Sequence, residues 1–121
     1  MTYKFQNLEI YHLALEYLDL IYAIAEKLPK SEDFNLKSQI TRAGTSIVLN
    51  IAEGSTSQSD AEQSRFLGIS LRSLIETVAC QDVLERRRYL NANELQPSRE
   101  LGQKLFAKTQ SMKRSLLRSG G

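Results

Sequence analysis

Few residues of this chain have side chains suited to catalysis or metal binding. The only histidine, His12, lies one helical turn from both Glu9 and Glu16, which indicates a paired surface group rather than a catalytic base. Glu9 and His12 have the Glu-x-x-His spacing of di-metal sites in helical bundles, but the chain has no second copy of it. The single cysteine, Cys80, excludes an internal disulfide and fits a small core residue.

A serine–histidine–aspartate arrangement is arithmetically possible, but no serine lies in a glycine-flanked nucleophile turn, and no glycine-rich phosphate loop occurs. The sequence therefore predicts no enzyme activity, no cofactor and no metal site.

Basic side chains offer a different chemistry, contact with phosphate. The net charge is only +2, but it is unevenly distributed: residues 1–35 carry three bases against six acids, and residues 99–121 carry six bases against one acid. Contact with phosphate neutralises such cations and binds without reading sequence. The predicted nucleic-acid surface comprises Arg65, Arg72, Arg86, Arg87, Arg88, Lys104, Lys108, Lys113, Arg114 and Arg118. The alternative is that these are solvated faces, in which cations offset helix dipoles and Arg72 pairs with Glu76.

A polar stripe marks the segment 35–53. Arg42 and Glu53 share one face of the expected helix but stand about 16 Å apart at 1.5 Å per residue, so they cannot pair with each other. Each therefore needs a partner on another helix or another subunit, or is hydrated. Asn50 lies at the border between this stripe and the core stripe.

The elements that must position these residues are helices, because apolar residues recur with helical spacing and strand-like alternation is not sustained. Pro29 stops the first helix, and Gly54 has the position of a helix-ending glycine. Ser59 and Glu62 form a capping box, and Asn91 offers the last cap. The predicted fold is all-α, an antiparallel up-down four-helix bundle over residues 1–121, with helices at about 8–28, 35–53, 60–87 and 94–117.

The first helix carries two apolar stripes. Its apolar arc covers about 200°, whereas a helix in a monomeric bundle needs somewhat over 100°. One stripe is therefore expected to face the bundle and the other a second subunit. We expect Leu13, Tyr17 and Leu20 to lie in that subunit interface, together with Arg42, Asn50 and Glu53.

Composition agrees with one ordinary globular domain. The 121 residues are 41% hydrophobic and 25% charged, which permits a real core. No stretch approaches the roughly 20 apolar residues that span a bilayer, and the first residues lack the layout of a secretory signal. A soluble, cytoplasmic domain with no membrane contact is expected.

The segment from Leu36 to Gly54 reads Leu-x-x-Gln-hydrophobic-x-Arg-Ala-x-x-Ser-Ile-x-x-Asn-Ile-Ala-Glu-Gly. This pattern resembles the four-helix bundle proteins, also called 23S ribosomal RNA intervening-sequence proteins, and the likeness spans residues 3–117. The resemblance implies an antiparallel bundle that forms homopentamers and has no enzymatic activity. Arg42, Asn50 and Glu53 match the motif, with structural or interface roles, whereas Gly44 and Leu49 depart from it.

One branch of that family is the accessory variability determinant of diversity-generating retroelements, which binds nucleic acid and a reverse transcriptase. The favoured function is thus a non-enzymatic homo-oligomer, of pentameric size by resemblance, whose basic surface contacts RNA or DNA, with a reverse transcriptase as a further partner. The alternative is a protein-binding scaffold that never touches nucleic acid. A bundle that binds a small molecule or metal is a third option.

Overall fold

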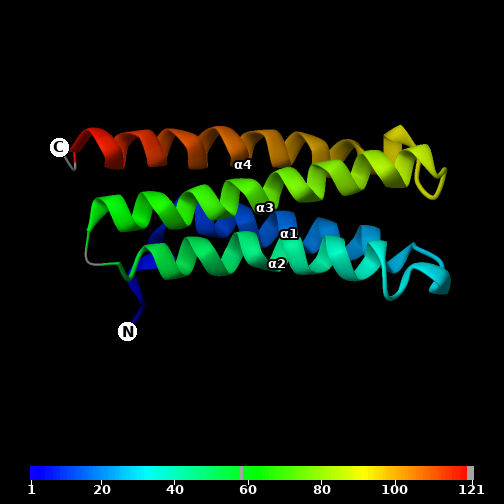
Figure 1. The fold of residues 1–121 in the computed structure, drawn as a ribbon, viewed down its shortest axis with the longest axis horizontal. Helices are drawn as coiled ribbons and strands as arrows, with labels where there is room; N and C mark the ends of the chain where they lie inside the picture. Colours follow the sequence, from blue (N-terminus) through cyan, green and yellow to red (C-terminus); the bar gives the residue numbers. More distant parts are fainter. Residues whose placement is uncertain (58, 120–121) are drawn as a thin grey trace.

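The computed structural model describes residues 1–57 and 59–119, and it is an antiparallel bundle of four helices (Figure 1). The helices are α1 (Glu9–Glu26), α2 (Leu36–Gly54), α3 (Asp60–Arg86) and α4 (Ala92–Ser119), with short 3-10 turns at Lys4–Asn7 and Lys30–Glu32. Each helix packs on its neighbours in the order α1, α2, α3, α4 and back to α1. The predicted fold class is confirmed, and the predicted helix ends are correct to within two residues.

Helix caps explain where α3 and α4 begin. The hydroxyl of Ser59 accepts a hydrogen bond from the backbone N–H of Glu62 at 3.1 Å, which is one of the two bonds of the predicted capping box. Asn91 forms a complete capping box: its side-chain oxygen accepts from the N–H of Glu94 at 2.8 Å, and the Glu94 carboxylate accepts from the N–H of Asn91 at 3.0 Å. Because this box starts α4 at Ala92, Pro97 lies inside the helix and beyond its first turn.

The role predicted for Gly54 is wrong. Gly54 is the last residue of α2, and the residue that follows it, Ser55, has an ordinary right-handed backbone (φ −73°). A glycine is needed here because a Cβ atom would lie 2.9 Å from the Cβ of Phe66 on α3. The glycine thus allows a close approach of two helices rather than a left-handed turn.

The core is aliphatic, with one buried polar network at its centre. The side-chain amide of Gln81 donates to the Tyr17 hydroxyl at 3.0 Å and to the Thr77 carbonyl at 3.2 Å. The Thr77 hydroxyl donates to the Leu74 carbonyl at 2.6 Å, so the Tyr17 hydroxyl must donate to it at 2.7 Å. Ser98 on α4 donates to the Gln81 oxygen at 2.6 Å. Every member has a partner, and the network joins α1, α3 and α4.

Candidate nucleic-acid and subunit interfaces

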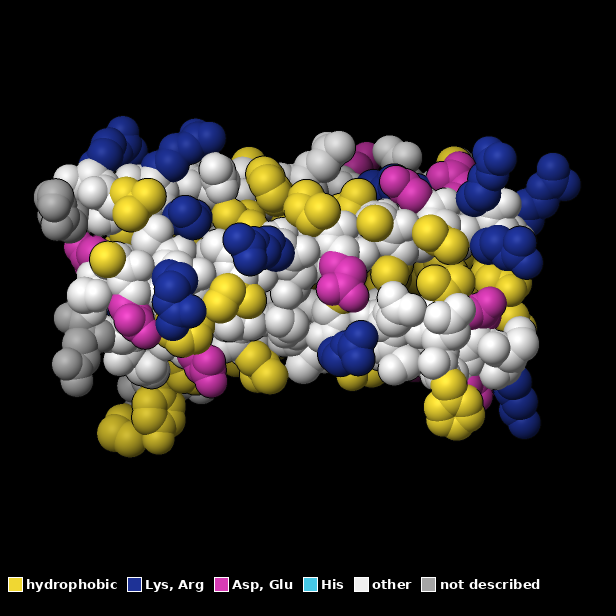
Figure 2. Space-filling model, in the orientation of Figure 1, with side chains coloured by type: hydrophobic (Ala, Val, Ile, Leu, Met, Phe, Trp, Pro, Cys, Tyr) yellow, Lys and Arg dark blue, Asp and Glu magenta, His cyan; other side chains and the backbone are white. Residues whose placement is uncertain are grey.

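Seven of the ten predicted cations lie at opposite ends of the bundle, whereas Arg72, Lys104 and Lys108 lie between these ends on α3 and α4. Arg65 and Arg86 are 21 residues apart on α3, which separates them by about 32 Å. One group, which we call the distal end, is defined by Lys30, Phe34 and Arg86–Arg88, where α1 meets α2 and α3 meets α4. The other, the terminal end, lies beside both chain termini and contains Arg65, Lys113, Arg114 and Arg118. Figure 2 shows Lys and Arg side chains at both ends of the molecule, with a few more along the middle of the face shown.

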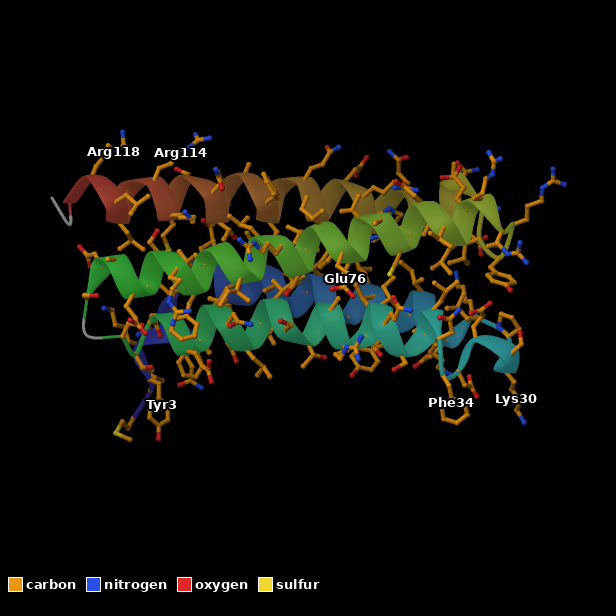
Figure 3. The ribbon with its side chains drawn as sticks, viewed as in Figure 1. Tyr3, Lys30, Phe34, Glu76, Arg114 and Arg118 are labelled. Carbon is orange, nitrogen blue, oxygen red and sulfur yellow. The ribbon has the colours of Figure 1, made fainter. Side chains whose placement is uncertain are left out.

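Two of the predicted cations already have partners within the chain. Arg65 contacts the Glu62 carboxylate at 3.3 Å and lies 4.8 Å over the centre of the Phe66 ring. Lys108 contacts Glu9 at 3.2 Å. The remaining predicted cations, Arg72 included, form no ion pair with a described residue, so the expected Arg72–Glu76 pair is absent from the described part of the chain. Figure 3 places Glu76 between the two basic ends.

The last turn of α3 holds Arg88 in a conformation that its side chain disfavours. The N–H of Tyr89 donates to the Leu84 carbonyl at 3.0 Å, and the N–H of Arg88 donates to the Glu85 carbonyl at 3.0 Å. This pair of bonds is a Schellman motif, whose left-handed position is usually glycine. Arg88 occupies that position with φ 64°, the only positive φ among the described residues other than glycines.

A hydrogen bond joins the two loops of the distal end. The Tyr89 hydroxyl donates to one Glu32 oxygen at 2.9 Å, and Asn35 donates to the other at 3.0 Å. The Tyr89 bond is the main reason that the pKa of Glu32 lies below its ordinary value of 4.5, with smaller contributions from Leu36, Asn35 and the charge of Arg87. The segment that carries Arg86–Arg88 and the segment Lys30–Asn35 are therefore neighbours.

Sequence reasoning missed Phe34. Its side chain is 100% exposed, and Figure 3 shows it projecting from the distal end beside Lys30. A hydrophobic residue just before a helix cap usually packs against the fourth helical residue. Here that residue is Gln39, so the absence of an apolar partner was the signal available in the sequence.

The interface predicted from α1 requires a correction. Leu13 and Tyr17 are 7% and 1% exposed, because both fill the core of their own chain, and they are therefore wrong as subunit contacts. Leu20 is partly buried. The other stripe of α1 is the exposed one: Tyr22 is 47% exposed, and Leu49 on the adjacent α2 is 57% exposed.

These exposed residues belong to a shallow groove along α2, of about 540 Å³, which Arg42, Asn50 and Glu53 also line. Neither Arg42 nor Glu53 forms an ion pair with a described residue, so the partner expected for each is not found within the described chain. Asn50 donates to the Ser46 carbonyl at 2.9 Å. We call the surface of this groove the α1/α2 face.

A second surface with exposed apolar residues lies on the opposite side, between α3 and α4. Ile75 is 53% exposed there, beside a groove of about 290 Å³ lined by Val78 and Phe106. Because the helices pack in a closed ring, this α3/α4 face points away from the α1/α2 face.

The residues considered for catalysis are not brought together. His12 contacts the Gln6 carbonyl at 2.7 Å through Nε2, rather than either flanking glutamate. Cys80 is buried, and desolvation, with a smaller contribution from Glu76, raises the pKa of its thiol. Among the described residues, no three acidic, histidine or cysteine side chains are grouped as a metal site would require. None of the described helices has the length and apolar character to cross a membrane.

The observations define an antiparallel four-helix bundle with basic ends and two side faces that each expose apolar residues. The family described as 23S rRNA-intervening sequence protein matches residues 6–112, and the chain belongs to that family. A solved structure from Bacteroides thetaiotaomicron, a protein of unknown function from the S23 ribosomal protein family, is similar to it with a TM-score of 0.79 and 26% identity, over 86% of this chain and 97% of that one. No curated protein matches the chain. Neither the description of the family nor that of the solved structure names an enzyme activity.

Proposed function

We propose that this chain is a cytoplasmic, non-enzymatic protein that assembles with copies of itself and presents basic surfaces to RNA or DNA. The observation that carries the proposal is the pair of basic ends. Their exposed arginines and lysines are, apart from Arg65, without ion-pair partners among the described residues. Unpaired surface cations are available to neutralise phosphates, and assembly would multiply each cluster.

Self-assembly is supported by the apolar residues exposed on the two side faces, Tyr22 and Leu49 on one and Ile75 on the other. If the α1/α2 face of one copy met the α3/α4 face of the next, the contact would be head-to-tail, and such contacts close into rings when the rotation permits. The pentamer implied by the family resemblance is one such ring. Segment charges agree with this pairing, since residues 1–35 are acidic overall and residues 99–121 are basic.

Mixing two variants tests the assembly. Leu49→Glu blocks the α1/α2 face, and Ile75→Glu blocks the α3/α4 face. Each variant alone should lose the wild-type mass measured by light scattering. An equimolar mixture should form a heterodimer through the one junction left intact. A wild-type mass of 13.7 kDa at micromolar concentration would refute self-assembly.

Salt-dependent binding tests the nucleic-acid part of the proposal. A duplex and a structured RNA should bind the wild type with an affinity that falls steeply between about 50 and 200 mM salt. The Arg86/Arg87/Arg88→Glu variant should bind more weakly with a flatter salt dependence. The matched Arg114/Arg118→Glu variant measures how much of the affinity comes from the terminal end. Unchanged affinity in both variants, or no binding by the wild type, would refute this part.

A protein-binding scaffold is the second candidate, and the exposed apolar faces favour it. The family resemblance supplies one specific partner, a reverse transcriptase, so we include that partner in the proposal. A reverse-transcriptase gene beside the coding sequence, followed by co-purification of the two proteins, would support it. A location inside a ribosomal RNA gene would argue against that partner.

A further inference from the structure

The distal end combines two features that the terminal end does not have: a fully exposed aromatic ring and a run of three arginines without ion-pair partners. Phe34 is 100% exposed, and Lys30 projects from the same short segment (Figure 3). Arg86, Arg87 and Arg88 are all exposed and form no ion pair with a described residue.

The Phe34 ring is 100% exposed and therefore packs against none of the described residues. It precedes the cap of α2, where a hydrophobic side chain would pack on the fourth helical residue, but that residue is Gln39. Two other aromatic rings are exposed but have different surroundings. Tyr22 is 47% exposed and lines the groove of the α1/α2 face, and Tyr3 stacks on Phe5 with 5.9 Å between ring centres. Phe34 is thus a free ring face.

The end of α3, with its arginines, and the turn that carries Phe34 are held together. Tyr89, which directly follows the arginines, donates to Glu32 at 2.9 Å, and Glu32 is two residues from Phe34. Arg88 keeps a left-handed backbone that glycine would adopt without strain. An arginine at a glycine position agrees with a role for its charge rather than its conformation.

We propose that the distal end binds single-stranded nucleic acid, with one unpaired base stacked on Phe34 and the adjacent phosphates beside Lys30 and Arg86–Arg88. This inference deepens the proposed function and rests on it, because it names the form of nucleic acid that the basic surface takes. Every base has a π-face, so such a stack tolerates any sequence. In a duplex both faces of an internal base are covered by its neighbours. The Phe34 ring therefore cannot stack on such a base, and it adds no affinity for a duplex.

The chemistry required is a phosphodiester chain with an exposed base, which single-stranded RNA and DNA both supply. A stacked base contributes roughly 5- to 150-fold in affinity, whereas each phosphate contact changes the salt dependence by about one unit of slope. Stacking and charge can therefore be measured separately on the same protein.

The test is fluorescence anisotropy with four probes of equal length: single-stranded RNA, single-stranded DNA, an abasic DNA strand and a closed hairpin duplex. Phe34→Ala should weaken binding of both single strands at least about 5-fold, and leave the abasic strand and the duplex within about 2-fold. Phe34→Trp should retain single-strand binding. Tyr3→Ala, which removes an exposed ring at the other end, is the matched control and should change nothing.

Wild-type binding that Phe34→Ala leaves intact on single strands would overturn this inference while the proposed function stands. A loss of assembled mass in Phe34→Ala would also overturn it, because Phe34 would then be a protein contact. If the wild type binds none of the four probes, the proposed function fails as well. A loss on both single strands that is larger for RNA or for DNA supports the inference and identifies the preferred strand.

Discussion

Replacing Arg88 by glycine should make the protein more stable while weakening its binding to nucleic acid. Arg88 has φ 64° in a Schellman motif whose two hydrogen bonds are both 3.0 Å long. The backbone motif is therefore well formed, and the unfavourable feature is a residue with a Cβ atom at a position that favours glycine. A left-handed conformation costs an L-residue about 1–2 kcal/mol. The greater freedom of glycine in the unfolded chain offsets about 0.5–1 kcal/mol of that gain. The expected net stabilisation is about 0.5–1 kcal/mol.

For a chain of this size, that free energy corresponds to a rise in Tm of about 2–5 °C, which thermal unfolding by circular dichroism can resolve. Arg88→Ala removes the same charge but keeps a Cβ atom, so it should stay near the wild-type Tm. Arg87→Gly should lower the Tm, because Arg87 has an ordinary φ of −76°. A Tm for Arg88→Gly at or below that of Arg88→Ala would refute the argument. Weaker nucleic-acid binding by a more stable variant cannot be attributed to unfolding.

Three further predictions concern stability. Thr77→Val leaves the buried phenol without an acceptor and should cost about 1–3 kcal/mol in chemical denaturation, whereas Thr77→Ser should recover most of that loss. Gly54→Ala should destabilise by about 1–3 kcal/mol through the 2.9 Å clash on α3, while Gly68→Ala, which meets only the end of a lysine at 3.3 Å, should stabilise by about 0.5–1 kcal/mol; equal Tm changes would contradict this contrast. Because the pKa of Glu32 is lowered on folding, its contribution to stability is present above pH 4.5 and is lost as the pH falls through the folded value; Tyr89→Phe should reduce that loss in acid titrations of stability, and an unchanged pH profile would argue against the bond.

The sequence predicted the four helices because their apolar periodicity is strong and their caps are explicit. Ser59 and Asn91 each accept the bond expected of a cap. The wrong prediction for Gly54 arose because glycine can either end a helix or allow two helices to approach closely. Gly54 ends a helix in the sequence pattern, but its function is a close contact with Phe66, which depends on how α2 and α3 pack.

Which stripe of α1 faces the core could not be read from one helix, because both stripes are equally apolar in sequence. The choice is made by polar partners 60 or more residues away: Thr77 and Gln81 hydrogen-bond the Tyr17 hydroxyl. A buried tyrosine hydroxyl needs such a partner, but nothing in the sequence around Thr77 or Gln81 indicates that they supply it. Phe34 was missed because an exposed ring leaves no periodic pattern, and the one available signal was the absence of an apolar partner at Gln39.

The central polar network and the distal end specify the same alignment of helices. Apolar packing is non-directional, so an aliphatic core alone would tolerate a slip of one helix along another. A slip of one turn moves a helix end by about 5.4 Å, which would break the 2.9 Å bond between Tyr89 and Glu32. It would equally break the bonds of Gln81, which reach Tyr17 on α1 and Ser98 on α4 from one side chain. Since only one register satisfies both sets of bonds, the polar residues at the centre also fix how the arginines lie relative to Phe34.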